Sequence, residues 1–133
     1  VRRHLVALDD AVRNLRRHAG RPLSALTDDR DETWIVERGL QLCAQNALDI
    51  ASHLVAGAGR DATDYAATID TLVPLGVLRN EFAARFRGVA GFRNLVVHGY
   101  LAIDLARVHA LLNERLGDFE EFARQVEEYL GAD

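Results

Sequence analysis

Apolar residues recur at three- and four-residue steps along most of the chain, and this spacing constrains the fold more than any other feature. Such spacing places the apolar side chains on one side of an α-helix, whereas a half-buried strand needs strict alternation. It predicts helices over about 1–19, 29–56, 65–73, 77–98 and from 104 to near the end of the chain. No stretch of convincing length has the pattern of a strand. The sequence therefore predicts an all-α protein.

The helix predicted over 29–56 is the longest, and polar residues stand among its apolar ones. Its buried side is expected to hold large apolar residues: Trp34, Ile35, Leu42, Leu48, Ile50, Leu54 and Val55. Asp49 and His53 are four residues apart, so they share one helix face and lie within reach of a hydrogen bond. The pair is interpreted either as part of an active-site wall or as a polar pair in or beside a bundle, and the second interpretation is favoured for His53. Cys43 is expected to be a small core residue.

An acidic run at residues 28–32 stands at the start of this helix. Thr27 or Asp28 suits the N-cap position, and acids in a first turn favour the positive end of the helix dipole. A metal site is the sharper alternative for these carboxylates, but no histidine or cysteine stands at ligand spacing. Capping therefore explains the run, and neither a metal nor another cofactor is predicted.

The later helices contain two glycines that matter for packing. Gly88 and Gly91 fall within the helix predicted over 77–98, where each costs roughly 1 kcal/mol relative to alanine. Small residues there would let another helix or a second subunit approach closely. The last helix is expected to begin at the cap Asp104 and to bend at Gly117. Together the predicted helices indicate one domain over 1–133, an antiparallel up-and-down bundle of four to five helices.

Composition and charge narrow the classes of function. The chain has 133 residues and a formal net charge of -4, which argues against a protein that binds nucleic acid through bulk positive charge. No apolar run approaches the ~18 residues that a membrane-spanning helix needs. The single cysteine excludes an internal disulfide framework and fits a reducing compartment. The sequence therefore predicts a cytoplasmic protein.

Contact with nucleic acid would have to come from a local patch of arginines. The 16 Lys and Arg positions of the chain are all arginine. The candidates for such a patch are Arg79, Arg85, Arg87 and Arg93, which are opposed nearby in the sequence only by Glu81.

One apolar segment carries three polar side chains of different chemistry: Arg93, His98 and Tyr100. A helix that ends at Gly99 would place Asn94 and His98 on one face, with Arg93 about 140° away in projection. A turn at the glycine would then swing His98 and Tyr100 back toward Arg93. The result would be an arginine–histidine–tyrosine cluster at a helix end, with an imidazole able to titrate near neutral pH.

Arg93 and His98 form the minimal set for phosphoryl transfer without a metal. Histidine can take a proton from a ribose 2′-hydroxyl or give one to a leaving 5′-oxygen. Arginine can hold the charge that builds on the phosphate. Because acid and base are both useful, a symmetric dimer would help by bringing two copies of His98 to one cleft. The spacing alone nevertheless favours a structural role, since a helix-end histidine that bonds a carbonyl is common.

The segment from Arg93 to Tyr100 resembles the signature of the HEPN superfamily, specifically its HepT-like family of bacterial and archaeal toxins. Residues 36–41 and 49–50 resemble the long second helix of that family, and residues 75–78 and 91–92 resemble the approach to its motif. The likeness covers roughly residues 28 to 122, and the arginine, histidine and tyrosine of the motif are all present.

This resemblance implies a small homodimeric helical toxin of a two-gene toxin–antitoxin system. Arg93 and His98 would be the catalytic pair of an RNA-cleaving enzyme at the dimer cleft, and Asn94 would orient the imidazole or contact phosphate. Tyr100 would accept AMP from ATP, transferred by a nucleotidyltransferase partner of the MntA type, and this modification would silence the toxin. The RNA target, tRNA or mRNA, stays open, and DNA is not expected as a partner.

Two rival interpretations remain open at this point. In the first, the chain is a non-catalytic helical module that docks a nucleotidyltransferase and helps to present its substrate. In the second, it is a structural dimerisation domain in which Arg93 and His98 satisfy buried carbonyls. Cleavage of RNA that depends on His98 separates the enzyme from both alternatives.

Overall fold

The computed structural model describes residues 1–91 and 104–131, and within these two ranges it contains seven α-helices and no strand. The helices are α1 (Arg2–Arg16), α2 (Ser24–Thr27), α3 (Arg30–Gly57), α4 (Tyr65–Thr71), α5 (Asn80–Phe86), α7 (Leu105–Glu114) and α8 (Leu116–Gly131). The prediction of an all-α antiparallel bundle is confirmed. The described ranges hold more helices than the four to five expected, because the last predicted helix is broken into α7 and α8 and the short helix α2 was not foreseen.

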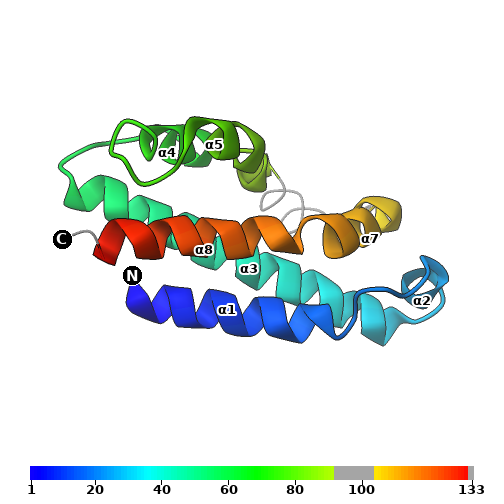
Figure 1. Ribbon diagram of the computed structural model, residues 1–133. Helices are drawn as coiled ribbons and strands as arrows, with labels where there is room; N and C mark the ends of the chain where they lie inside the picture. Colours follow the sequence, from blue (N-terminus) through cyan, green and yellow to red (C-terminus); the bar gives the residue numbers. More distant parts are fainter. Residues whose placement is uncertain (92–103, 132–133) are drawn as a thin grey trace.

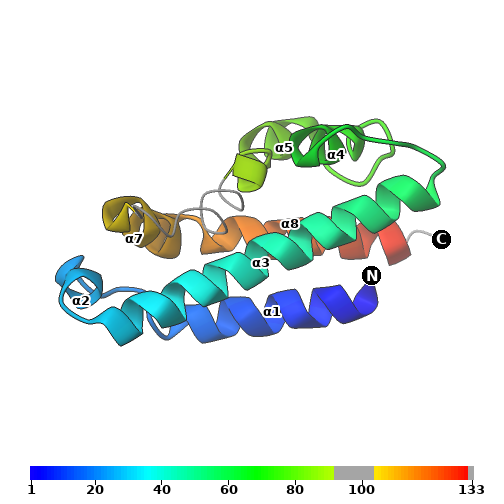
Figure 2. The ribbon, with the colours of Figure 1, turned by 180° about the vertical axis from the view of Figure 1, so that it is seen from behind.

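Three long helices, α1, α3 and α8, lie side by side and form the body of the molecule (Figure 1). α1 runs opposite to α3 and α8. The short helices α4 and α5 lie along the C-terminal half of α3, while α2 and α7 lie at the other end (Figure 2). The start of α1 and the end of α8 lie at the same end of the bundle, far from α2 (Figure 1).

The first helix follows its sequence pattern closely. Leu5, Leu8, Val12 and Leu15 are all buried in the core, as the spacing predicts. The chain turns after the helix at Gly20, whose φ of 81° lies in the left-handed region that glycine enters without a steric penalty. This turn brings the chain back so that α3 can pack antiparallel to α1.

Small residues line the side of α3 that faces the core. Cys43, Ala44, Ala47 and Ala51 are all fully buried there. Gly39 allows an even closer approach, because a Cβ atom at this position would lie 2.4 Å from a methyl carbon of Leu15. The expectation that Cys43 is a small core residue is confirmed, and burial raises the pKa of its thiol to about 12.

The predicted buried side of α3 is partly wrong. Leu48, Ile50 and Val55 are buried as expected, and Leu54 is partly buried. Trp34, Ile35 and Leu42, however, have exposed fractions of 67%, 50% and 36%. Other residues of α3, among them Leu40, Leu48 and Ile50, fill the sides that the neighbouring helices cover, and these three large side chains lie on the outward side of the helix.

Helix caps were predicted with mixed success. α3 is capped by Asp29 and not by Thr27 or Asp28, since the carboxylate of Asp29 accepts bonds from two backbone N–H groups of the first turn at 3.1 and 3.3 Å. Asp104 caps α7 in the same way, as predicted. The acidic run is therefore used in capping and in the first turn of α3, as the sequence suggested.

The last two predicted helices, over 77–98 and from 104 onward, are both interrupted. α5 ends at Phe86 and a turn that includes Gly88 follows, so the expected continuous helix over 77–98 is wrong in its described part. A Cβ atom at Gly88 would come no nearer than 3.9 Å to its surroundings, and one at Gly91 would meet nothing within 4 Å. No described helix therefore needs these glycines for a close approach. The final helix breaks at Arg115, two residues before the predicted bend at Gly117.

Buried polar side chains tie distant elements together. Glu32, in the first turn of α3, lies 2.6 Å from Nδ1 of His18 and 3.1 Å from a guanidinium nitrogen of Arg21, so it fixes the loop after α1. The buried Gln125 of α8 accepts a bond of 2.9 Å from the backbone N–H of Arg79, at the start of α5. These contacts hold the short helices in place on the three long ones.

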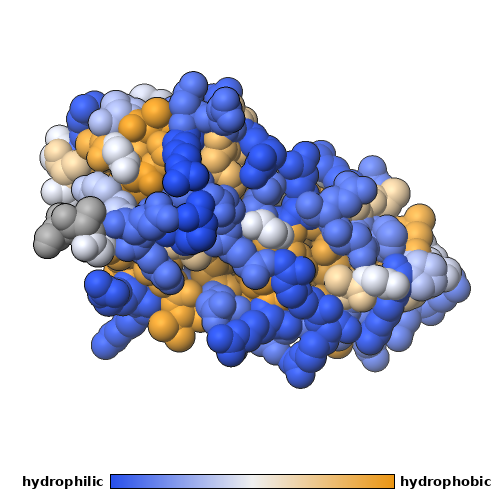
Figure 3. All heavy atoms as spheres, in the orientation of Figure 1, coloured by the Kyte–Doolittle hydropathy of each residue, from blue (hydrophilic) through white to orange (hydrophobic). Residues whose placement is uncertain are grey.

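Hydrophilic residues cover most of the face shown in Figure 3, and apolar residues are visible there in small separate areas. No helix of the described residues is both long enough and apolar enough to cross a membrane.

Candidate functional site

The residues predicted to carry the chemistry, Arg93, Asn94, His98 and Tyr100, lie in the segment 92–103, outside the described residues. The geometry of the site therefore comes from its surroundings. The described chain enters this segment at Gly91 and leaves it at the cap of α7. What lies at these two points decides which groups meet a substrate near the motif.

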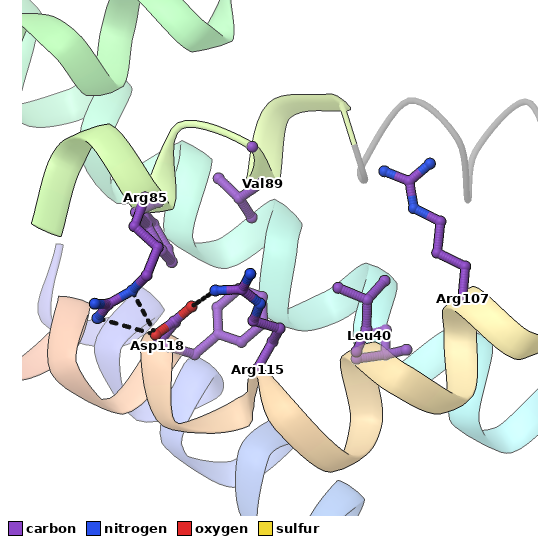
Figure 4. Close-up of a pocket in the computed structure, with 10 residues that line it drawn as sticks. Leu40, Arg85, Val89, Arg107, Arg115 and Asp118 are labelled. Atoms are coloured by element: carbon purple, nitrogen blue, oxygen red, sulfur yellow. Dashed lines mark hydrogen bonds and ion pairs between the residues drawn. The ribbon is translucent and has the colours of Figure 1, made fainter.

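A cavity of about 190 Å³ opens where α5, α7 and α8 meet (Figure 4). Its wall includes Val89, which stands shortly before the motif segment, and Arg107, which stands shortly after it. Three other polar residues, Arg85, Arg115 and Asp118, complete the polar part of the wall. The cavity therefore adjoins both described ends of the segment that carries the motif.

Asp118 holds two of the three arginines. Its Oδ1 atom accepts a hydrogen bond of 3.2 Å from Nε of Arg85, and its Oδ2 atom lies 3.3 Å from a terminal nitrogen of Arg115 (Figure 4). The Asp118 side chain is only 19% exposed, while those of Arg85 and Arg115 are about half exposed. One shielded carboxylate thus fixes two guanidinium groups at the mouth of the cavity. Arg107 forms no ion pair with any acid of the described residues.

The floor of the cavity is apolar and rigid. It includes Leu40 of α3, Phe86 of α5 and Phe119 of α8, all of them buried. The Phe86 ring stacks on Phe122 with centroids 4.9 Å apart and meets Phe119 edge-on at 5.7 Å. Such aromatic packing fixes α5 against α8. It therefore also fixes the position from which Arg85 reaches the cavity.

Two described members of the predicted arginine patch, Arg79 and Arg87, pair with acids of other elements, and the patch stays a prediction. Arg87 pairs with Asp70 at 3.2 Å, and a nitrogen of Arg79 lies 3.8 Å from a carboxylate oxygen of Glu128. The acids come from α4 and α8, so counting charges only along the local sequence could not find them. Arg85 alone among the described candidates lines the cavity.

Arg107 and Arg115 were missed by the sequence analysis. Both stand in or next to an amphipathic helix, where an arginine ordinarily lies on the solvated face, so their spacing gives no sign of a site. A weak signal was present nonetheless. The motif segment leads directly into α7, and basic residues at the start of the next helix are candidates to face the same ligand.

Asp49 and His53 do not lie in this cavity, and each contacts a different neighbour. Oδ1 of Asp49 accepts a hydrogen bond of 2.8 Å from Gln45. The exposed ring of His53 lies against the ring of His4, with centroids 5.6 Å apart. His4 in turn lies 3.1 Å from the side-chain oxygen of Asn46. These contacts join the start of α1 to α3, and a role in a site wall stays a prediction.

No group of three or more His, Cys, Asp or Glu side chains in the described ranges is placed to hold a metal ion. The polar wall of the cavity is rich in guanidinium donors and contains one carboxylate. Such a wall suits an anionic ligand with several acceptor oxygens.

Comparison with known proteins identifies the family. The family model described as ribonuclease HepT-like matches residues 8–126. The chain belongs to the HepT-like ribonuclease family. The match includes the whole motif segment and extends beyond the residues 28 to 122 over which the sequence alone shows the resemblance. The predictions of a HepT-like protein and of a ribonuclease are thereby confirmed at the level of the family.

Among its relatives is a tRNA nuclease HepT from Aphanizomenon flos-aquae (strain 2012/KM1/D3). The two sequences are 32% identical over 102 residues, which are 75% of this chain and 69% of that protein. This identity extends over most of both chains.

Similar solved structures confirm the fold. One is a tri-AMPylated HEPN toxin from Shewanella oneidensis in complex with an MNT antitoxin; its TM-score is 0.83 at 20% identity, over 95% of each chain. A second is a toxin–antitoxin structure with AMP-PNP, which has a TM-score of 0.84 at 19% identity and covers 95% of this chain and 96% of that one. A third is the protein YutE from Bacillus subtilis, with a TM-score of 0.83 at 17% identity, over 98% of this chain and 88% of that one.

Proposed function

We propose that this chain is the toxin of a HepT/MntA-type toxin–antitoxin system and that it is a metal-independent endoribonuclease. The observation that carries the proposal is the family match over 8–126, within which the arginine, histidine and tyrosine of the motif are all present. The relative from Aphanizomenon flos-aquae is named a tRNA nuclease. tRNA is therefore the first substrate to test.

Arg93 and His98 are the proposed catalytic pair. A base takes the proton from a ribose 2′-hydroxyl, whose oxygen then forms a bond to the adjacent phosphorus. The bond from phosphorus to the 5′-oxygen breaks, and an acid returns a proton to that oxygen. The products are a 2′,3′-cyclic phosphate and a 5′-hydroxyl. Arg93 offsets the charge that develops on the phosphate, and Asn94 orients the imidazole or contacts the phosphate.

A homodimer is part of the proposal, because one histidine cannot be base and acid in the same step. Two copies of His98 at a shared cleft would supply both roles. Gly88 and Gly91 are exposed, and a Cβ atom would come no nearer than 3.9 Å to its surroundings at the first and meet nothing within 4 Å at the second, so a second subunit has room to approach them. Light scattering at micromolar concentration should give the mass of a dimer, and a monomer would remove the two-histidine mechanism.

Tyr100 is the proposed site of control by a nucleotidyltransferase partner. Its oxygen would form a bond to the α-phosphorus of ATP, with loss of the tyrosine proton and release of pyrophosphate. The resulting adenylate adds negative charge and bulk next to the groups that must receive an RNA phosphate. Support comes from the similar structures, one of which holds a tri-AMPylated toxin with its antitoxin.

The decisive test of the enzyme is RNA cleavage in excess EDTA by the wild type and by His98→Ala. The wild type should cut tRNA into fragments that end in a cyclic phosphate, and the variant should not, although its melting temperature is unchanged. Equal cutting by the variant would show a contaminating nuclease and overturn the assignment of His98. A variant that melts far below the wild type would instead indicate a structural role.

The control of the toxin is tested by intact mass after co-expression with the nucleotidyltransferase. The wild type should gain mass in steps of one AMP, and Tyr100→Phe should gain none. If the two proteins co-purify, no mass is gained and no RNA is cut, the chain is a docking module for the nucleotidyltransferase.

A further inference from the structure

We propose that the cavity between α5, α7 and α8 binds a phosphate of the RNA strand next to the bond that is cut, with Arg107 as its principal ligand. This inference rests on the proposed function and adds a substrate-positioning site to it. Nothing in the motif itself assigns these residues. The charge of the cavity, its size and its place in the chain all support such a site.

The charge of the cavity is opposite to that of the whole chain. The protein carries a formal net charge of -4, yet the wall of the cavity holds three arginines and one aspartate, a local balance of +2. Two of the guanidinium groups share Asp118. Each arginine has five N–H donors in a planar fork, so the two that contact Asp118 keep donors for a second anion.

Of the three arginines in the cavity wall, Arg107 is the one whose charge is least neutralised. It rises from the first turn of α7, lines the cavity and stands apart from Arg85, Asp118 and Arg115 (Figure 4), and no acid of the described ranges pairs with it. The nearby carboxylate of Asp104 accepts a hydrogen bond of 3.3 Å from the backbone N–H of Arg107 and forms no ion pair with its guanidinium. Its guanidinium therefore offers both a full charge and a fork of donors to a phosphate.

The size of the cavity points to part of a larger ligand. Sites that enclose a whole small molecule ordinarily measure about 300–1,000 Å³, whereas this cavity has about 190 Å³. A phosphate with its sugar fits such a volume better than a complete free nucleotide does. The apolar floor of Leu40, Phe86 and Phe119 suits the sugar or the face of a base, while the arginines at the rim suit the phosphate.

The place of the cavity connects it to the motif. Val89 and Arg107 line it, and they stand on either side of the segment 92–103 in the sequence. In this proposal, a strand that reaches the catalytic residues passes the described residues on either side of the segment. A phosphate held by Arg107 would fix the register of the strand relative to the bond that is cut.

The test compares Arg107→Gln with Arg13→Gln in the full chain. Arg13 is also an exposed helix arginine and pairs with Asp9 at 2.9 Å, but it does not line the cavity. Both variants remove one positive charge, so a difference between them is local. The probe is a fluorescein-labelled, mixed-sequence 2′-O-methyl RNA oligonucleotide, which lacks the attacking hydroxyl, and its binding is followed by anisotropy over a range of salt concentrations.

Arg107→Gln should weaken binding about five- to tenfold and reduce the slope of log affinity against log salt by about 0.7, the value for one phosphate contact on a single strand. Arg13→Gln should change neither quantity. Arg107→Lys should keep most of the slope, since it keeps the charge, while it loses part of the affinity with the fork. Cleavage of ordinary RNA should show a raised KM for Arg107→Gln and a smaller change in kcat.

Two results would overturn the inference: the same affinity and slope for Arg107→Gln and Arg13→Gln, or no binding of the probe by the wild type. The proposed function fails separately. If the wild type binds the probe through Arg107 but cuts no RNA, the cavity still binds phosphate, and the proposed cleavage and the place of the phosphate next to a cut bond are wrong. If the wild type cuts RNA and Arg107→Gln cuts it with the same KM, the ribonuclease stands and the phosphate site is wrong.

Discussion

The contact between α1 and α3 at Gly39 yields a prediction whose magnitude can be worked out from the structure. An alanine at this position would place its Cβ atom 2.4 Å from Cδ2 and 2.7 Å from Cγ of Leu15, well inside van der Waals contact. Leu15 is 1% exposed, so its side chain has no open space to enter. Either the leucine adopts a poor rotamer or the two helices move apart.

Two opposing effects set the size of the change. Alanine in place of glycine inside a helix stabilises the folded chain by about 0.5–1 kcal/mol. Overpacking a tight core contact costs about 1–3 kcal/mol. Gly39→Ala should therefore lower the free energy of unfolding by about 1 kcal/mol. Gly117→Ala is the matched control, because a Cβ atom there meets nothing within 4 Å and the variant should be as stable as the wild type or more so.

The assay is urea unfolding followed by circular dichroism, at one fixed protein concentration because association would shift the apparent stability. Leu15→Ala removes the obstructing atoms and should cost about 2–5 kcal/mol in the wild type. In the Gly39→Ala background it should cost at least about 1 kcal/mol less, since the clash is relieved. If Gly39→Ala is stabilised as much as Gly117→Ala and shows no coupling to Leu15, the argument from close helix approach is refuted.

Three further changes test other features of the fold. Glu32→Gln should lower the free energy of unfolding by about 1–2 kcal/mol in urea titration, because its partners lose a charged acceptor, whereas Asp31→Asn in the same first turn should change it by less. Cys43 should resist alkylation by iodoacetamide at pH 8 until the chain unfolds, because burial raises the pKa of its thiol to about 12; rapid labelling of the folded protein would contradict this. The pKa of Glu121 is lowered to about 2, chiefly by its hydrogen bond from Arg124, so its contribution to stability is present above about pH 4.5 and is lost as the pH falls toward 2. When the pH is lowered over that range, the melting temperature of Glu121→Gln should therefore fall less steeply than that of the wild type.

The sequence predicted best those features that depend on local spacing. The buried positions of α1, the extent of the longest helix and the cap at Asp104 all follow from three- and four-residue periodicity and from capping chemistry. These rules act within a few residues, so neighbouring elements rarely change the outcome. The bundle class followed from the same information.

The sequence failed where packing between helices decides the outcome. Trp34, Ile35 and Leu42 are the kind of residues that an apolar pattern assigns to a core, yet they are exposed. Size favours burial but does not determine which side of a long helix its neighbours cover. In α3 the covered sides carry glycine, alanine and cysteine between Leu40, Leu48 and Ile50, and the small residue at Gly39 lets α1 approach closely.

The candidate site also has one part that the sequence predicts and one part that only the fold shows. The motif at Arg93, His98 and Tyr100 can be recognised because its residues stand close together in the sequence and resemble a family signature. The arginines of the cavity cannot be recognised in this way, since they come from α5, from α7 and from the corner before α8. Only the fold shows which of them are neutralised by acids from other elements.

The motif lies in one segment, whereas the cavity arginines come from several elements, and this difference affects how such a protein would bind and cut RNA. A proton transfer needs groups held within hydrogen-bond reach, and the proposed catalytic residues of each copy stand within one short segment. Binding of a strand instead needs positive charges spaced along its phosphates, and a chain with net charge -4 can supply them only where the fold gathers arginines. Asp118 makes this gathering possible, since two guanidinium groups at one rim would repel each other without a shared carboxylate. The affinity for RNA should therefore depend on Arg107 and its neighbours, and the rate of cleavage on the motif.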